Sequence, residues 1–172
     1  NPFWGVCTLA ICKPAIRRTA SEGDWIVATG SKNTKDQGDL SNKVIYAMKV
    51  TKKMTLQEYD DYCRNHLQKK IADWENRDPR RRLGDCIYDF SVNPPNQRIG
   101  VHNEGNRKTD FGGKNVLLSD HFYYFGENPI DLCDKLLPIA HKTQGHKSTA
   151  NEPYKELFVK WITDQGKTPN KL

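Results

Sequence analysis

Residues 1–32 read NPFWGVCTLAICKPAIRRTASEGDWIVATGSK, and this stretch decides which fold the chain can adopt. Its apolar run ends at Lys13-Pro14, and proline is favoured in the first turn of a helix because its missing N–H is not needed there. A short basic helix is therefore predicted over residues 15–20. Gly23-Asp24 then turns the chain into a run rich in β-branched and aromatic residues, which predicts a strand over Trp25–Thr29. Together these elements form one compact stretch of about the size of a βαβ unit.

Further strands and helices are predicted in the remaining chain. Thr55 and Glu58 form a capping-box pair, and apolar side chains follow it every three or four residues. This pattern predicts a helix from Thr55 to about Arg77, with Trp74 on its buried stripe. Other patterns predict strands over Lys43–Thr51, Gly84–Asp89, about Arg98–His102, Val116–Ser119 and His121–Phe125, and helices from Asn128-Pro129 to about Leu136 and over about Glu152–Asp164. We therefore expect an α+β fold: one domain, residues 1–172, with a small, curled, barrel-like mixed sheet and helices packed outside it.

Composition restricts the class of protein. The chain has 172 residues, a formal charge of +6 and a mean hydropathy of −0.81. No apolar run approaches the roughly 20 residues that cross a bilayer, so no membrane association is expected. Five cysteines without a CxxC pair favour a reduced, cytoplasmic protein and predict no metal site. Cys7 and Cys12, five positions apart in an apolar run, are expected to be small buried side chains.

Familiar enzyme signatures are absent from the sequence. It contains neither GxSxG nor HExxH, and Gly112-Gly113-Lys114 is followed by asparagine where a phosphate-binding loop needs serine or threonine. No cofactor is predicted. A histidine beside an aspartate can act as a general base, but adjacent strand residues point to opposite faces, so Asp120 and His121 are not expected to pair directly. The simpler interpretation of His121, and of His102, is a surface histidine at a turn. The acid–base candidates that remain are Asp24, Asp85, Asp120 and His121.

Aromatic and basic side chains define a second kind of candidate site. Trp25, Tyr123 and Tyr124 lie in predicted strands, and the Ser31-Lys32 turn follows the strand that begins at Trp25. A ring outside the core can stack on a base, which contributes about 1–3 kcal/mol per base. The basic residues expected to hold phosphates are Lys13, Arg17, Arg18 and Lys32. The alternative for the rings is packing in the core, and the alternative for the basic residues is a solvated basic helix. The run Arg80–Arg82 likewise has two interpretations: a solvated surface, or a contact to a phosphate backbone.

Several segments carry a resemblance to a known family. These segments lie in order over residues 1–126, and they are NPFWGVCTLAICKP with IRR and GDWIVATGS, then VIYAMKVTKKMTLQEY, GDCIYD and VLLSDHFYYFG. They resemble the successive motifs of the second type of nucleotide-modification-associated domain, a family tied to base modification in DNA.

A second resemblance rests on Trp4-Gly5-Val6, a short basic helix, Gly23-Asp24, a strand ending in Ser31 and a following strand with Tyr46-Ala47-Met48-Lys49-Val50. This order is similar to the EVE, ASCH and YTH branch of PUA-like domains, and the resemblance implies a small curled barrel that holds a modified base in an aromatic-lined pocket. Ser31 falls where such domains often place a pocket serine, whereas Thr29-Gly30 replaces their usual aromatic residue.

Two hypotheses of different classes follow. The leading one is a binding module for a modified or flipped nucleotide, in which Trp25, Ser31 and one of Tyr123 and Tyr124 contact the base. The opening stretch, residues 1–32, is then expected to bind rather than to react. The alternative is an enzyme that installs or processes a base modification with the acid–base candidates named above, and a plain protein-interaction domain is a third possibility. For the first two, the expected partner is nucleic acid, with DNA favoured by the resemblance.

Overall fold

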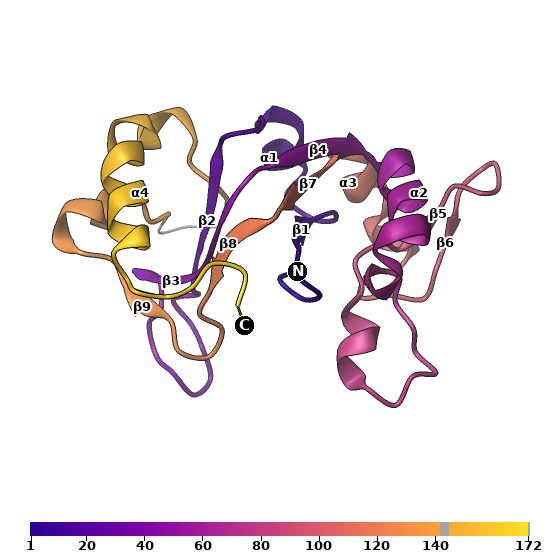
Figure 1. Ribbon diagram of the computed structural model, residues 1–172, viewed down its shortest axis with the longest axis horizontal. Helices are drawn as coiled ribbons and strands as arrows, with labels where there is room; N and C mark the ends of the chain where they lie inside the picture. Colours follow the sequence, from indigo (N-terminus) through magenta and orange to yellow (C-terminus); the bar gives the residue numbers. More distant parts are fainter. Residues whose placement is uncertain (142–144, 172) are drawn as a thin grey trace. The chain divides into compact units, whose positions relative to one another are not determined.

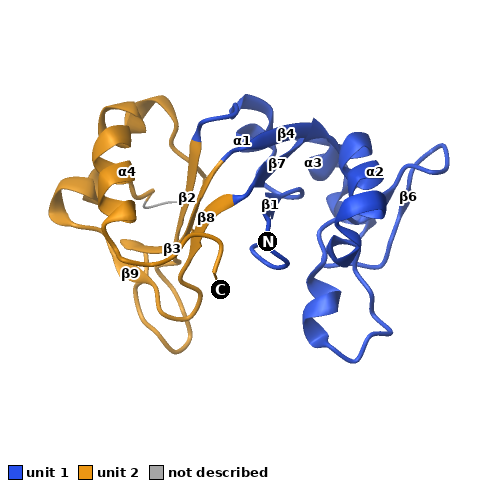
Figure 2. Cartoon of the chain, viewed as in Figure 1, with its two compact units in different colours: residues 1–24, 50–120 blue, residues 25–49, 121–172 orange. Residues whose placement is uncertain are grey.

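The computed structural model describes residues 1–141 and 145–171 and has a mixed α/β structure. The chain divides into two compact units, shown in different colours in Figure 2. Unit 1 comprises residues 1–24 and 50–120, and unit 2 comprises residues 25–49 and 121–172. Each unit is therefore assembled from two segments of the chain. No helix in the described part of the chain is long and apolar enough to cross a membrane.

Unit 1 is built on an antiparallel sheet with the strand order β1-β7-β4 (Figure 1). The register pairs Cys7 with Ser119 and Lys52 with Leu118, so β7 is the central strand. A separate pair of short strands, β5 and β6, is also antiparallel. The elements of unit 1 are β1 (Cys7–Leu9), α1 (Pro14–Thr19), β4 (Lys52–Thr55), α2 (Leu56–His66), η1 (Gln68–Lys70), η2 (Pro79–Leu83), β5 (Tyr88–Asp89), β6 (Asn96–Gln97), η3 (Glu104–Asn106), α3 (Arg107–Gly112) and β7 (Asn115–Ser119).

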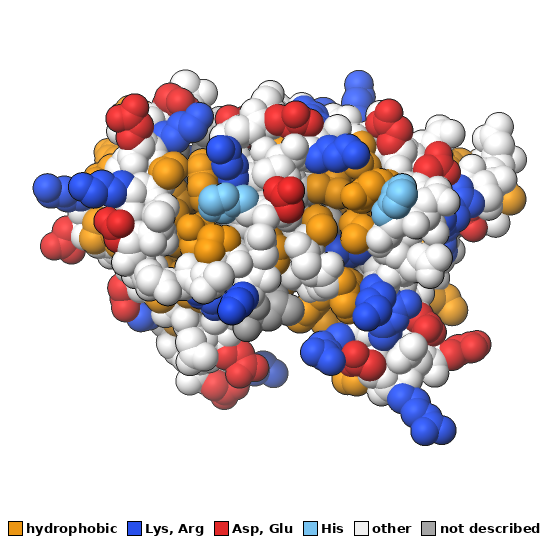
Figure 3. Space-filling model, viewed as in Figure 1, with side chains coloured by type: hydrophobic (Ala, Val, Ile, Leu, Met, Phe, Trp, Pro, Cys, Tyr) orange, Lys and Arg blue, Asp and Glu red, His pale blue; other side chains and the backbone are white. Residues whose placement is uncertain are grey.

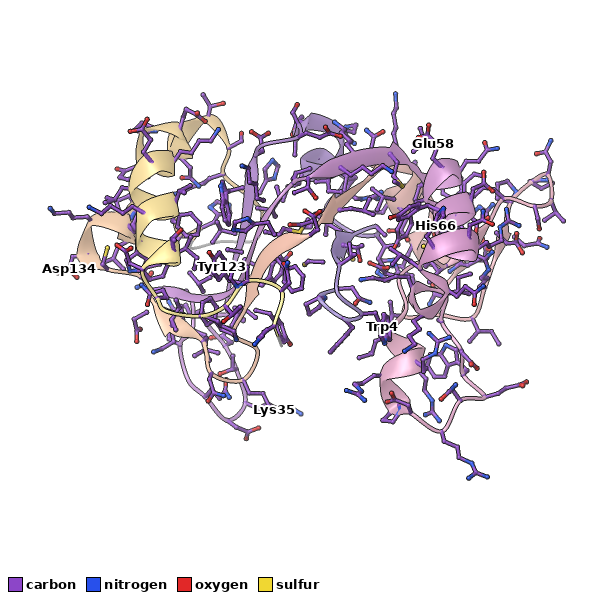
Figure 4. The ribbon with its side chains drawn as sticks, viewed as in Figure 1. Trp4, Lys35, Glu58, His66, Tyr123 and Asp134 are labelled. Atoms are coloured by element: carbon purple, nitrogen blue, oxygen red, sulfur yellow. The ribbon has the colours of Figure 1, made fainter. Side chains whose placement is uncertain are left out.

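Helix α2 provides much of the hydrophobic core of unit 1. It begins at the predicted capping box: the Glu58 N–H donates to the Thr55 hydroxyl (3.2 Å), and the Thr55 N–H donates to the Glu58 carboxylate (2.7 Å). Its buried face carries Tyr59 and Cys63, which belong to the same cluster as Val116 of β7. Figure 4 labels Glu58 in the first turn of this helix.

Unit 2 is built on strands in the order β2-β3-β8, with β9 paired to the beginning of β3 (Figure 1). All of these pairs are antiparallel. Phe158 and Ile162 of α4 pack in one cluster with Val44 and Ala47 of β3, so the helix covers one face of the sheet. The elements of unit 2 are β2 (Trp25–Thr29), β3 (Lys43–Lys49), β8 (His121–Tyr124), β9 (Ile130–Asp131), η4 (Asp134–Ile139), η5 (Thr149–Tyr154) and α4 (Lys155–Thr163).

Residues near the end of the chain bind main-chain groups of β8. The Asn170 N–H donates to the Phe122 carbonyl (2.7 Å), and the Phe122 N–H donates to the Asn170 side-chain oxygen (3.0 Å). The Lys167 ammonium donates to the carbonyl of Tyr124 and lies over the Phe125 ring, 5.0 Å from its centroid. The segment that contains Lys167 and Asn170 therefore runs along β8.

The mixed α/β class and several elements agree with the sequence-based prediction. The short helix predicted over residues 15–20 is α1, and the strand predicted over Trp25–Thr29 is β2 with the same bounds. The described strands form three sheets, and none of these closes into a barrel, so the predicted barrel-like sheet is not found. The expectation of one domain over residues 1–172 stays a prediction.

The helix predicted from Thr55 to about Arg77 is too long, because α2 ends at His66. Lys70 gives the physical reason. Its ammonium group is buried and donates to the Val6 carbonyl (2.7 Å) and to the Thr8 hydroxyl (2.9 Å), and the chain turns through η1 to bring it there. Trp74 consequently lies outside a helix and is 43% exposed, instead of lying on a buried stripe.

Two further predicted elements are wrong. The region from Asn128-Pro129 contains β9 and the 3₁₀-helix η4 rather than an α-helix, because Ile130 and Asp131 pair with β3. The strand predicted at about Arg98–His102 is a loop that follows β6.

Candidate active site

The turn between β1 and α1 holds Cys12 in an unusual backbone conformation. Cys12 and Lys13 have φ angles of 59° and 39°, in the left-handed region that residues other than glycine rarely adopt. Pro14 begins α1 directly after them. The Cys12 side chain is exposed, which corrects the expectation that it would be buried, whereas Cys7 is buried as expected. Strained residues of this kind cluster at functional sites, so the neighbours of Cys12 are of interest.

His102 and Asp110 extend from Cys12 as a chain of hydrogen bonds. His102 Nε2 lies 3.0 Å from Cys12 Sγ, and His102 Nδ1 lies 2.6 Å from Asp110 Oδ2. A carboxylate can only accept, so the hydrogen-bond network assigns the proton to Nδ1 and leaves Nε2 as the acceptor for the thiol. A thiol, an imidazole and a carboxylate in this order match a nucleophile, its general base and the group that orients the base.

Asp110 fixes several parts of this site at once. It is fully buried in α3, and its Oδ2 also accepts a hydrogen bond from the Tyr88 hydroxyl (2.9 Å). Its Oδ1 accepts from the main-chain N–H of Cys12 (2.9 Å). The loop that carries His102 is held separately, because Gln97 Nε2 donates to the His102 carbonyl (2.8 Å). The carboxylate therefore positions both the imidazole and the backbone of the cysteine.

Arg17 supports the site from inside the protein. It is fully buried, and its guanidinium group donates to the carbonyls of Cys12 (2.8 Å), Asn115 (2.9 Å) and Asp110 (2.5 Å). A Cβ at Gly113 would collide with this group, which explains the glycine there. With its donors used in this way, Arg17 does not reach a phosphate. Its predicted phosphate-binding role is corrected to a structural one that joins the turn after β1 to α3 and β7.

The surroundings of Cys12 favour the thiol over the thiolate. Partial burial raises the pKa of Cys12, the negative charge of Asp110 raises it further, and Arg17 and Lys13 oppose the increase. Cysteine attacks as a thiolate, so the site needs a base to remove the proton. His102 Nε2 is in position to do so.

The same three side chains do not converge on a single point. His102 uses opposite ring nitrogens for Cys12 and Asp110, which suits proton transfer better than shared coordination of an ion. Within residues 1–141 and 145–171, no group of three or more His, Cys, Asp or Glu side chains is arranged to hold a metal.

Most of the other predicted residues of unit 1 have defined places. Lys13 and Arg18 are exposed on either side of Arg17 in the sequence, and Arg18 donates to the Gly112 carbonyl (2.6 Å). Asp85 is buried and accepts from the hydroxyls of Thr8 (2.5 Å) and Tyr59 (2.7 Å), as a structural carboxylate does. Asp24 accepts from the Ser21 N–H (2.8 Å) in a turn, and Asp120 is exposed after β7. These bonds of Asp85 and Asp24 stabilise parts of unit 1 other than the turn at Cys12.

The remaining predicted residues lie in unit 2. The Trp25 ring stacks on Tyr123, with centroids 6.3 Å apart and planes 18° apart, and His121 meets Trp25 edge-on at 5.6 Å. Tyr123 is buried and Tyr124 half-buried, as expected for neighbours on opposite faces of a strand. Ser31 and Lys32 are exposed in the loop after β2. Trp25 and Tyr123 thus contact each other and belong to the core cluster, while Ser31 and Lys32 remain on the surface.

Sequence reasoning missed the central residues of the site. Cys12 and His102 are 90 positions apart, and neither lies in a recognised catalytic motif. The available signal was a cysteine in a tight turn between a predicted strand and a helix beginning at Pro14, a context in which a nucleophile can be presented. Asp110 and His102 are only eight positions apart, but the sequence predicts a loop over residues 103–114, whereas the structure forms η3 and α3 there and places Asp110 in α3.

Comparison with family models identifies the class of the chain. The model of nucleotide modification associated domain 2 matches residues 1–171. The chain therefore belongs to this family, which confirms the resemblance seen in its motifs. Comparisons with curated proteins and with solved structures found no match.

Proposed function

We propose that this protein is an enzyme of nucleotide modification in which Cys12 is the nucleophile. The observation that carries the proposal is the continuous relay from Cys12 Sγ through the two nitrogens of His102 to Asp110 Oδ2, with distances of 3.0 and 2.6 Å. The family name supplies the substrate class, because it links the domain to nucleotides. This is the enzyme hypothesis of the sequence analysis, with a different set of catalytic residues.

The proposed chemistry is covalent substitution at an electrophilic carbon of the nucleotide. His102 Nε2 accepts the thiol proton as Cys12 Sγ forms a bond to that carbon, and Asp110 stabilises the resulting imidazolium. His102 then returns the proton to the group that leaves. Water, activated by the same imidazole, releases the product and restores the thiol. The exposed Lys13, which follows Cys12 in the sequence, and the exposed Arg18 of α1 supply positive charge for the phosphate of the substrate.

Site-resolved alkylation tests the relay. We expect iodoacetamide to modify Cys12 at neutral pH, and His102→Ala to slow this by about a hundredfold, the lower end of a general-base contribution. Mass spectrometry of the same samples gives the rate at Cys133, an exposed cysteine of unit 2, as an internal control. Equal rates at Cys12 in the wild type and in His102→Ala, with Cys133 unchanged, contradict the relay.

The nucleotide part of the proposal needs a separate measurement. Nucleosides from cells that express the wild type are compared by mass spectrometry with those from cells that express Cys12→Ser. We expect a species gained or lost only with the wild type. Identical nucleoside profiles, together with normal accumulation of both proteins, overturn the assignment of the relay to nucleotide chemistry.

The second candidate is recognition of a modified base in DNA by unit 2. It is favoured by the exposure of Ser31 and Lys32 directly after β2, the strand that begins at Trp25. In this role Ser31, Trp25 and a tyrosine of the pair Tyr123 and Tyr124 contact the base and Lys32 a phosphate. The PUA-like fold of such readers stays a prediction.

Gel shifts with modified and unmodified DNA test this second role. We expect tighter binding of the modified DNA, and an affinity about tenfold weaker in Ser31→Ala and in Lys32→Ala, as removal of one hydrogen bond or ion pair to the ligand can produce. Lys35→Ala is the matched control, because Lys35 is an exposed lysine in the same loop (Figure 4). Negligible binding, or equal binding of both DNAs by every variant, rules out the reader role.

A further inference from the structure

Three arginines and two tryptophans form a surface in unit 1 that the proposed chemistry does not use. Arg80, Arg81 and Arg82 lie in η2, and they follow one another without an intervening residue. Arg81 Cζ is 5.7 Å from the centroid of the Trp4 ring, and Arg82 Cζ is 5.7 Å from that of Trp74. Figure 4 labels Trp4 close to the short helix of this region. We name Trp4, Trp74 and Arg80–Arg82 the arginine–tryptophan surface.

The backbone of this surface is fixed by polar contacts. Asp78 accepts from the Arg80 N–H (3.0 Å) and caps η2, which begins at Pro79. The Arg81 carbonyl accepts from the Asp73 N–H (2.9 Å), and Arg81 also donates to the Lys69 carbonyl (2.5 Å). The main chain that carries Arg80 and Arg81 is therefore fixed before any ligand binds, and a preformed backbone lowers the entropic cost of binding.

The charges of the surface are only partly balanced. Arg80 is 3.2 Å from Asp78, and Arg81 is 3.9 Å from Asp73. Among the described residues, no carboxylate forms an ion pair with Arg82, whose guanidinium instead lies over Trp74. Figure 3 shows Lys and Arg side chains next to acidic and apolar ones in this lower part of unit 1. The excess of positive charge suits an anionic partner.

Trp74 indicates what kind of anion the surface takes. At 43% exposure it is one of the few large apolar side chains that the described chain leaves in solvent. An exposed indole beside arginines can stack on a base while the arginines contact the flanking phosphates, which is the usual arrangement for single-stranded nucleic acid. In a duplex the bases are already stacked on each other, so Trp74 would have no free base face to cover.

We propose that the arginine–tryptophan surface binds single-stranded nucleic acid, with Trp74 stacked on a base and Arg80 and Arg82 on phosphates. The proposal concerns binding of a polymer and does not depend on the chemistry at Cys12. It implies that the protein acts on, or is recruited to, unpaired stretches of nucleic acid rather than only free nucleotides.

Fluorescence anisotropy with a short, labelled single-stranded DNA tests the proposal. We expect Trp74→Ala to weaken binding by about tenfold, which is within the range for one stacked base. Arg82→Ala is also expected to weaken binding. The slope of log Kd against the logarithm of the salt concentration should fall by roughly one for each phosphate that the variant no longer neutralises. A duplex of the same sequence is expected to bind more weakly than the single strand.

The control is Lys52→Ala in the same unit. Lys52 is exposed, and its ammonium lies 4.7 Å from the centroid of the Tyr62 ring, so it is another surface cation over an aromatic ring. Unchanged affinity in both Trp74→Ala and Arg82→Ala overturns the proposal. A loss of affinity in Lys52→Ala as large as that in Trp74→Ala and Arg82→Ala also overturns it, because this would show attraction by net charge alone. Binding of the duplex as tight as that of the single strand also overturns it. Cys12→Ser is expected to bind like the wild type, so failure of this test and failure of the proposed chemistry are distinguishable.

Discussion

The two units bury different kinds of side chains. All of the buried polar and charged residues of the described chain belong to unit 1: Thr8, Arg17, Asp60, Lys70, Asp85, Asp110 and Ser119. The buried side chains of unit 2 are apolar, apart from the hydroxyl of Tyr123. Burial of a charge is costly unless the charge is paired and hydrogen-bonded, so unit 1 depends on specific geometry where unit 2 depends on apolar packing.

This difference indicates where the chemistry of the protein is located. In unit 1 the buried charges hold particular groups in place: Arg17 and Asp110 hold the turn at Cys12, and Lys70 holds the segment of Val6 and Thr8. Polar networks of this kind rigidify a site when every member is satisfied. A core of apolar residues, such as that of unit 2, supplies stability without orienting reactive groups.

The largest effect that we expect comes from breaking a buried charge cluster in unit 1. Asp60 is fully buried, forms ion pairs with Arg98 (2.7 Å) and Arg64 (3.1 Å), and accepts a hydrogen bond from the N–H of Phe90 (2.8 Å). Asp60→Ala should lower the free energy of unfolding by about 2–3 kcal/mol, because it removes a fully buried carboxylate, weakens the pairing of the partly buried Arg98 and leaves the Phe90 N–H without its acceptor. Urea denaturation followed by circular dichroism gives the free energy, and main-chain hydrogen exchange shows which unit loses protection.

Asp61→Ala is the matched control, because Asp61 is the next residue and pairs with Arg64 at the surface (2.8 Å). It should change the free energy of unfolding by less than about 1 kcal/mol, as surface ion pairs do. Similar values for Asp60→Ala and Asp61→Ala would contradict the view that unit 1 is stabilised by its buried charges. Loss of exchange protection mainly in unit 2 would contradict it as well.

A smaller effect should follow from raising the pH. Burial raises the pKa of Cys7 and of Tyr59, and a hydrogen bond with Cys63 together with burial raises the pKa of Cys86, all in unit 1. Each of these groups has a higher pKa in the folded chain than in the unfolded chain. Its contribution to the free energy of unfolding is therefore fully present below the unfolded pKa, which is about 8.5 for cysteine and 10 for tyrosine. It is lost as the pH rises above them, by up to about 1.4 kcal/mol per pH unit for each group, because the unfolded chain releases its protons first.

Unit 2 should respond less to alkali, because its single cysteine, Cys133, is exposed. Hydrogen exchange, corrected for the intrinsic rate at each pH, measures the protection of the two units separately. We expect protection in unit 1 to fall between neutral and alkaline pH while that in unit 2 changes little. An equal fall in both units would show that the buried cysteines and Tyr59 do not control the difference.

The parts that could be predicted from the sequence follow local patterns. Alternating and aromatic residues predicted β2, β3 and β8, and Pro14 predicted the beginning of α1. The capping box of Thr55 and Glu58 likewise predicted where α2 begins. The end of α2 could not be predicted, since it depends on contacts of Lys70 with residues that are more than 60 positions away.

The candidate site is less visible in the sequence for the same reason. The basic residues near Cys12 were noticed, but the burial of Arg17 depends on carbonyls of residues 110 and 115, which no local pattern reveals. His102 alone has the pattern of a surface histidine. Only the fold brings it between a thiol and a buried carboxylate.

The contact of Asn170 with β8 has a consequence for self-association. A strand with unpaired N–H and C=O groups at the edge of a sheet is a template for a strand of another molecule. Asn170 satisfies both groups of Phe122, the N–H through its side-chain oxygen and the carbonyl through its own N–H. One asparagine therefore occupies the positions at which an intruding strand would begin to pair, and it protects an aromatic strand from aggregation.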